Sequence, residues 1–259
     1  EGGVEVKART FDGVDWSPIS SATFKVNTIP ASANNLVVSE LNYRPEPATD
    51  EEKVAGFSSR GDFEFIELLN INTARSINLE GVNFAGGIDF TFNGNLAAEA
   101  LVLPPGGRVV LVDNVEAFNF RYPNSRAIIG GNYAGNLSND GEQIHIVSSN
   151  GTTIKDFTYN DVAPWPTTPD GDGFTLTLVD PDKNPDHSDP TNWTASLNIG
   201  GSPGQADGEG FIGNPEADQD GDGLNAFLEY AFGTNHSDAK SGVWPSIRLD
   251  DLSVNNESA

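Results

Sequence analysis

Short apolar runs separated by turn residues are the feature that most limits how this chain can fold. The clearest example is EQIHIVSSNGTTIKDFTY (residues 142–159), where two alternating runs flank an Asn-Gly pair. A period of two places apolar side chains on one face of a strand, and Asn-Gly adopts the positive φ angles of a tight hairpin turn. Segments of this kind predict antiparallel β-sheets.

The same pattern recurs through the middle of the chain. The expected strands are apolar runs bounded by turn residues, and they are LVVSELNY (36–43), FEFIELLN (63–70), IDFTF (88–92), the pair within ALVLPPGGRVVLVD (100–113), GFTLTLVD (173–180) and NWTASL (192–197). FEFIELLN is apolar on both faces, which is typical of a central strand covered on both sides. Only NVEAFNFRYP (114–123) is expected to contain a helical turn or two. The sequence therefore predicts an all-β, antiparallel sandwich of about seven to nine strands.

Turn residues and linkers also divide the chain. Residues 1–26 contain two alternating runs around an Asp-Gly pair, which predicts a hairpin. The expected parts are a hairpin remnant of a preceding fibronectin type III-like domain (1–26), a linker (27–35), the main sandwich (36–204), a second linker (205–217), a loop and helix (218–238) and the start of a following segment (239–259).

Charge and composition limit the partners and the cellular location. The net charge is −24, with 38 acidic against 14 basic residues, so the chain repels phosphate backbones and attracts divalent cations. Nucleic acid is therefore not an expected partner. The sequence contains no cysteine, and no apolar run approaches the roughly 18 residues of a membrane span. The chain begins at Glu1 and has no methionine, and we expect it to be a fragment of a longer, secreted or surface-attached protein.

An acidic loop, ADQDGDGLNAFLEY (217–230), predicts a calcium site. A hard cation takes six to eight oxygen ligands at roughly 2.3–2.6 Å, so alternate side chains of a tight loop must point inward. Gly223 provides the positive φ that such a loop needs. The expected ligands alternate along the loop and end at a helix, and they are Asp218, Asp220, Asp222, the carbonyl of Leu224, and Glu229 as a bidentate ligand.

The surroundings of this loop differ from those of a paired EF-hand. The preceding residues GEGFIGNPEA contain three glycines and a proline, so no incoming helix is expected. Asn225 occupies a position that is usually apolar. The loop resembles the single-helix repeats of dockerins and thrombospondin type 3 modules, and this resemblance implies weak binding and a structural role. A second acidic run, PDGDGF (169–174), has no acid at residue 181 and predicts a turn.

No catalytic constellation is expected. The histidines His145, His187 and His236 are scattered, and the sequence contains neither a cysteine nucleophile nor a Gly-x-Ser-x-Gly elbow. Glu64 and Glu67 have an odd spacing and so lie on opposite faces of one strand. Glu67 shares its face with apolar residues, where burial and pairing, for example with an arginine, explain it without catalysis. We therefore expect a non-enzymatic protein.

Trp165 and Trp193 allow two interpretations. Both lie near the ends of expected strands, in VAPWP and DPTNW. Exposed rings would bind a sugar or a protein partner, whereas buried rings would cap the core of the sandwich.

The order of short motifs from LVVSELNY through DFEFIELLN, LPPGGRVVLV, GNLSNDGEQIHIVSSNG, VAPWP and DGDGFTLTLVDP to NWTASLNIGGSPG resembles the bacterial lamin-tail domain family. The resemblance covers about residues 35 to 204 and implies an immunoglobulin-like sandwich, but the family has no agreed activity. We expect a non-catalytic adhesion or spacer module that contacts a protein or cell-surface component. The alternatives are an accessory domain beside a secreted nuclease, phosphatase or CotH-like kinase, and a carbohydrate-binding module.

Overall fold

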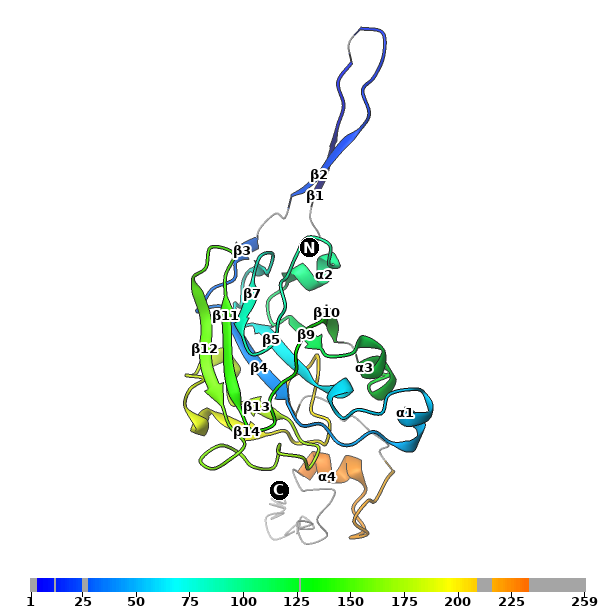
Figure 1. The fold of residues 1–259 in the computed structure, drawn as a ribbon, viewed down its shortest axis with the longest axis vertical. Coiled ribbons are helices and arrows are strands. Elements are labelled where there is room, and N and C mark those ends of the chain that lie inside the picture. Colours follow the sequence, from blue (N-terminus) through cyan, green and yellow to red (C-terminus); the bar gives the residue numbers. More distant parts are fainter. Residues whose placement is uncertain (1–3, 12, 25–27, 126, 209–215, 233–259) are drawn as a thin grey trace, which may run out of the picture. The chain divides into compact units, whose positions relative to one another are not determined.

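The computed structural model describes residues 4–11, 13–24, 28–125, 127–208 and 216–232 (Figure 1). It divides into two compact units, Glu1–Asp207 and Gly208–Ala259. The first unit contains nearly all of the regular structure and is mostly β.

The first unit is built from strands and short helices. Its strands are β1 (Val4–Ala8), β2 (Ser20–Phe24), β3 (Thr28–Pro30), β4 (Leu36–Asn42), β5 (Phe65–Asn70), β6 (Ser76–Asn78), β7 (Asn83–Gly86), β8 (Val102–Leu103), β9 (Arg108–Val112), β10 (Ile128–Asn132), β11 (Glu142–Val147), β12 (Thr153–Tyr159), β13 (Leu176–Leu178) and β14 (Trp193–Ala195). Its helices are α1 (Asp50–Val54), α2 (Ala98–Leu101), α3 (Val115–Arg121) and the 3-10 turns η1 (Gly61–Phe63), η2 (Pro181–Lys183) and η3 (Pro190–Asn192).

Two sheets enclose the main core. The larger has the order β10-β9-β5-β4-β13-β14, and the smaller has the order β12-β11-β7. Apolar side chains of both, such as Ile66 and Leu68 from β5 and Ile144 and Ile146 from β11, belong to one buried cluster. Figure 1 shows β11 and β12 beside β4 and β5. This arrangement is the predicted sandwich.

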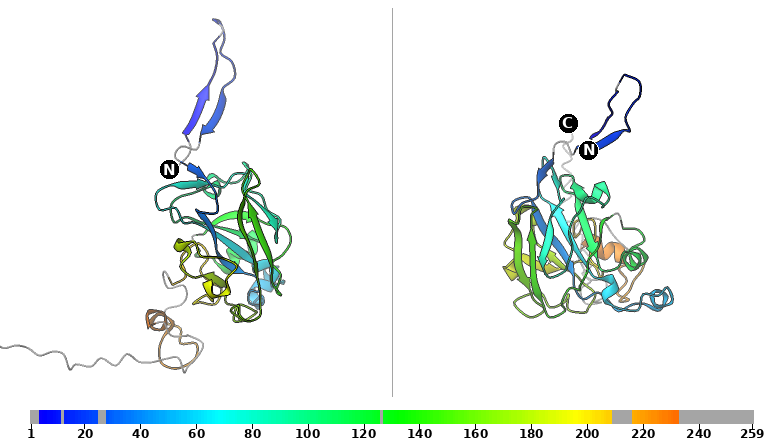
Figure 2. Two further views of the ribbon diagram at one scale, coloured as in Figure 1. Left: turned by 90° about the vertical axis from the view of Figure 1, so that its left-hand side faces the viewer. Right: turned by 45° about the horizontal axis from the view of Figure 1, so that its top comes forward.

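The opposite face of the larger sheet is covered as well. Phe65 of β5 and Val110 and Val112 of β9 form a second buried cluster with Phe118 of α3. The rings of Phe65 and Phe118 meet edge to face, with centroids 6.0 Å apart. The right-hand view of Figure 2 shows β11 and β12 on one side of β4 and β5 and α3 on the other. The prediction of a central strand covered on both faces is therefore confirmed.

Local sequence patterns give several elements correctly. β11 and β12 form the predicted hairpin, with Ile144 opposite Phe157 and with Gly151 at φ +81° in the turn. β1 and β2 form the predicted antiparallel hairpin. The helical turn expected within residues 114–123 is α3.

Other expectations about strands and linkers are wrong. IDFTF (88–92) makes only isolated bridges, at Asp89 and Thr91, and is not a strand. The two strands expected in residues 100–113 are β8 and β9, which belong to different sheets and do not form a hairpin. β3 lies in the expected linker 27–35 and pairs with β6. The β3–β6 and β9–β10 pairs are parallel, so the sandwich is not purely antiparallel.

Candidate functional site

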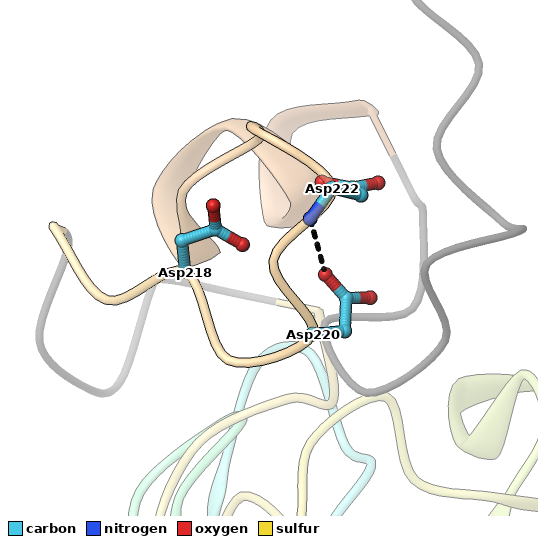
Figure 3. A group of neighbouring side chains, drawn as sticks. All are labelled: Asp218, Asp220 and Asp222. Carbon is cyan, nitrogen blue, oxygen red and sulfur yellow. Dashed lines mark hydrogen bonds between the residues drawn. The ribbon is translucent and has the colours of Figure 1, made fainter.

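Three aspartates converge in the second unit, in the loop before α4 (Ala226–Phe232). One carboxylate oxygen of each of Asp218, Asp220 and Asp222 lies within 4.8 Å of the others (Figure 3). No other group of three such acidic or imidazole side chains occurs among the residues that the structure describes. The predicted alternation of inward-pointing acids is therefore present in the geometry.

Backbone amides and two glycines shape this loop. Gly221 and Gly223 have φ angles of +75° and +92°, so the positive φ predicted at Gly223 is confirmed. Their amides donate to the two carboxylate oxygens of Asp218, at 2.9 and 3.1 Å. The amide of Leu224 donates to Oδ1 of Asp222 at 2.8 Å. These short-range bonds wind the chain around the acidic side chains.

The remaining predicted ligands follow the aspartates. Leu224 and Glu229 are buried, and the amide of Glu229 donates to the carbonyl of Asn225 at 3.0 Å. Asn225 also accepts from the amide of Leu228 through Oδ1 at 3.0 Å, which makes it the N-cap of α4. The capping role explains why Asn225 occupies a position that is usually apolar in an EF-hand loop. The sequence signal for this role is an asparagine directly before an apolar helical stripe.

The donor set of this loop suits a hard cation. Oδ2 of Asp220 is buried and accepts no hydrogen bond within the described part of the chain. A buried carboxylate oxygen that accepts no hydrogen bond carries an uncompensated desolvation free energy, unless a cation or a water molecule binds it. All of the side-chain atoms available to bind a metal are oxygens. Calcium and magnesium prefer oxygen ligands, whereas thiolate ligands are typical of zinc sites.

A second group of acidic side chains is buried in the first unit. Glu40 of β4 lies opposite Glu67 of β5, and the two residues are 1% and 0% exposed. Oε1 of Glu67 accepts from Arg108 Nη1 at 2.5 Å and from Ser39 Oγ at 2.6 Å. Oε1 of Glu40 accepts from Thr175 Oγ1 at 2.6 Å. The prediction that Glu67 is buried and paired with an arginine is confirmed.

Burial raises the pKa values of both carboxyl groups of this pair. Burial, followed by the negative charge of Glu67, raises the pKa of Glu40 from 4.5 to about 8. Burial also raises the pKa of Glu67, against the opposing charge of Arg108. Glu40 was not among the residues predicted from the sequence, although a charged residue inside the apolar strand LVVSELN was the available signal.

Glu64 has separate partners. Its Oε2 accepts from the amide of Leu137 at 2.8 Å and from the hydroxyl of Tyr133 at 3.3 Å. Burial raises the pKa of Glu64 to about 7. Because Glu64 and Glu67 bond to different elements, they do not flank a common site, as their odd spacing predicts.

The histidines also serve the fold. His187 is buried, accepts from the amide of Val38 through Nε2 at 3.2 Å, and donates from Nδ1 to the carbonyl of Pro185 at 3.0 Å. Burial lowers the pKa of His187 to about 4, with the charge of Lys155 as the next cause. His145 lies 3.2 Å from Thr153 Oγ1 on the half-exposed face of β11. His236 and the expected segment 239–259 lie outside the described residues.

The two tryptophans are core residues. Trp165 is 8% exposed and Trp193 is 4% exposed, and their ring centroids are 6.1 Å apart. Trp193 stacks on Phe157 and donates from Nε1 to the carbonyl of His187 at 2.9 Å. Buried rings favour the packing interpretation, because a sugar needs an exposed ring face.

The two packed sheets define an immunoglobulin-like β-sandwich module. The family model described as Lamin Tail Domain matches residues 29–161, just over half of the 259 residues. The chain belongs to the lamin tail domain family. The match begins at β3 rather than at residue 35, and β13 and β14 complete the larger sheet beyond it.

Other comparisons give no match. No curated protein matches the chain, and no solved structure does. None of the described helices is long and apolar enough to cross a bilayer.

Proposed function

We propose that this protein is a non-catalytic interaction and spacer module of a secreted, multidomain bacterial protein, and that a structural calcium ion orders its second unit. The immunoglobulin-like sandwich is a scaffold that presents surfaces and separates neighbouring domains, and a fold alone supplies no chemistry. The proposed partner is a protein or another component of the cell surface.

The observation that carries the non-catalytic role is the use of the buried ionisable groups. Every buried carboxyl or imidazole group among the described residues of the first unit bonds to backbone or side-chain groups of another segment. These residues are Glu40, Glu52, Glu64, Glu67 and His187. Groups that hold strands and turns together are not available to move protons to and from a substrate.

The calcium proposal rests on the acidic loop. Asp218, Asp220 and Asp222 supply the convergent carboxylates, and a cation would compensate the buried Oδ2 of Asp220, which accepts no hydrogen bond from the described residues. The proposed set is completed by the carbonyl of Leu224 and by Glu229. The single loop lacks a paired partner, and we expect a Kd on the order of 10⁻⁴–10⁻³ M, as in extracellular calcium modules.

Calorimetry tests the calcium site directly. Titrating calcium into the full chain should give heat that disappears in the double variant Asp220→Ala, Asp222→Ala. The matched control is Asp172→Ala, Asp182→Ala, which removes two exposed acids of the first unit and should leave the heat unchanged. Equal heats from the two double variants would mean that calcium binds to general surface charge rather than to this loop.

Limited proteolysis tests the structural role of the ion. Calcium should slow cleavage within residues 216–232 of the parent chain and should have no effect on cleavage of the Asp220→Ala, Asp222→Ala variant. Turnover of a substrate by the purified chain would contradict the non-catalytic role, whatever the calcium experiments show.

A further inference from the structure

The last residues of the first unit cross the outer face of the larger sheet. Residues 198–207, here called the strap, follow β14 and contact the side of β5 that carries Phe65 and Glu67, away from the main core. The amide of Ser202 donates to Oε1 of Glu40 at 2.9 Å, and its hydroxyl lies 3.2 Å from Oε2. The amide of Gly204 donates to Oε2 of Glu67 at 2.6 Å.

The strap fits closely over the carboxyl pair. A Cβ atom on Gly201 would lie 1.9 Å from Oε1 of Glu40, so only glycine allows this approach. Gly201 and Gly204 also have positive φ angles, +73° and +90°. The strap therefore has no room for a side chain at residue 201, and below it Glu40 and Glu67 are only 1% and 0% exposed.

We propose that the strap is a pH-controlled latch, which stays closed while Glu40 carries a proton and opens when Glu40 ionises beside Glu67. In the closed state the protonated Glu40 can donate to the hydroxyl of Ser202 while its other oxygen accepts from the Ser202 amide. Ionisation places a second negative charge next to Glu67 in a site without solvent, and opening relieves this by admitting water.

The charged groups around Glu40 give a net negative site. Glu67 of β5 faces it directly, Arg108 of β9 neutralises Glu67, and Asp207 lies at the end of the strap. β13 contributes the neutral Thr175, and the end of α3 contributes the neutral Tyr122, whose hydroxyl donates to the carbonyl of Gly200 at 2.9 Å. Within the described part of the chain, Arg108 is thus the one positive charge beside the two carboxyl groups of Glu40 and Glu67. This disfavours a negative charge on Glu40 in addition to that on Glu67.

The direction of the pH effect follows from the two states of Glu40. The closed state has a Glu40 pKa of about 8, and exposure to water on opening returns the pKa toward 4.5. The closed state therefore binds the proton more tightly. Closure is strongest below the pKa of the open state and weakens as pH rises toward the pKa of the closed state.

Opening of the strap can be local. The strap is the C-terminal end of the first unit and contains no strand, so releasing it breaks no sheet pairing. Its other described attachments include the bond from Ser125 Oγ to the carbonyl of Pro203, at 3.2 Å. An open strap would lengthen the connection to the second unit by at most about 3.3–3.6 Å per residue. This consequence rests on the proposed spacer function, whereas the latch itself does not.

Hydrogen exchange of the full chain tests the latch. The readout is the protection factor of the Ser202 and Gly204 amides, which corrects for the pH dependence of intrinsic exchange. Between about pH 5 and about pH 8 this protection should fall by up to tenfold per pH unit, because each unit of pKa difference is a factor of ten in the equilibrium. In Glu40→Gln the protection should stay constant over the same range.

The matched control is Glu64→Gln. Glu64 is also buried and has a raised pKa, but it bonds to Leu137 and Tyr133 and not to the strap. This variant should keep the pH-dependent loss of strap protection. Constant protection in the parent chain, or an unchanged loss of protection in Glu40→Gln, would overturn the proposal.

A measurement on the unmodified chain covers the case in which Glu40→Gln does not fold. The carbon-13 shift of the Glu40 carboxyl carbon should titrate with a midpoint between the ordinary value of 4.5 and the closed-state value of about 8, in step with the loss of strap protection. A midpoint near the ordinary value of 4.5, or a midpoint near 8 without any change in strap protection, would contradict the latch.

Discussion

Nη1 of Arg108 lies 2.5 Å from Oε1 of Glu67, whose side chain is fully buried, while that of Arg108 is 12% exposed. This ion pair is diagonal between the neighbouring strands β5 and β9, because Arg108 lies opposite Leu69 and Glu67 lies opposite Val110. Burial raises the pKa of Glu67, and the positive charge of Arg108 opposes this rise and favours the ionised form of Glu67 next to Glu40.

Removing Arg108 is expected to destabilise the first unit. In Arg108→Met the charge of Glu67 stays buried without its ion pair, and the expected loss is about 3–5 kcal/mol of the free energy of unfolding. Urea denaturation measures this loss. The double variant Arg108→Met, Glu67→Gln should recover part of it, because no uncompensated charge remains. The exposed pair Lys183–Asp180 provides the control, and Lys183→Ala should leave the urea midpoint unchanged.

Replacing Glu64 is expected to change how stability depends on pH. Its pKa of about 7 in the folded chain exceeds the ordinary 4.5, so its contribution to stability is fully present below pH 4.5 and is lost as pH rises through about 7. Glu64→Gln, which cannot ionise, should match the parent at pH 4 and exceed it at pH 8, by on the order of 1 kcal/mol or more. A difference that is equal at both pH values would contradict this account.

His187 is expected to act in the opposite direction. Its folded pKa of about 4 lies below the ordinary 6.5, so the neutral imidazole stabilises the folded chain above pH 6.5, and this contribution is lost as pH falls through about 4. His187→Gln keeps an acceptor for the Val38 amide and removes the titration. Urea midpoints of the variant should therefore fall less than those of the parent between pH 6.5 and pH 4.

Trp193 is expected to support stability rather than sugar binding. Trp193→Phe removes the hydrogen bond to the carbonyl of His187 and should cost about 1 kcal/mol, whereas Trp193→Ala should cost about 3–5 kcal/mol. Thermal unfolding measures both. A glycan array should show no binding above background for the parent chain. A glycan signal that Trp165→Ala abolishes without loss of stability would favour the sugar-contact interpretation instead.

Asn225 is expected to support the acidic loop through α4. Asn225→Ala removes the side-chain acceptor of the Leu228 amide and should destabilise the second unit by about 1 kcal/mol. Faster hydrogen exchange at the first amides of α4 would report this change. Asn225→Asp keeps an acceptor at the same position and should exchange like the parent.

The sequence by itself determined those features whose partners are close in the chain. The β11–β12 hairpin follows from alternation around Asn150 and Gly151, and the acidic loop follows from three aspartates at alternate positions and the positive φ of Gly223. The burial of both faces of FEFIELLN was also predictable from the sequence, because its apolar residues occupy both faces of the strand. In each case a few neighbouring residues contain the cause.

Only the tertiary structure decided the features that depend on distant segments. IDFTF alternates like a strand, yet the chain offers it only isolated bridges, and β3 becomes a strand because β6 lies beside it. Glu40 is isolated from solvent by residues more than 130 positions later in the sequence, Thr175 and Ser202. Its proton affinity depends on desolvation and on the charge of Glu67, and a local sequence pattern contains neither.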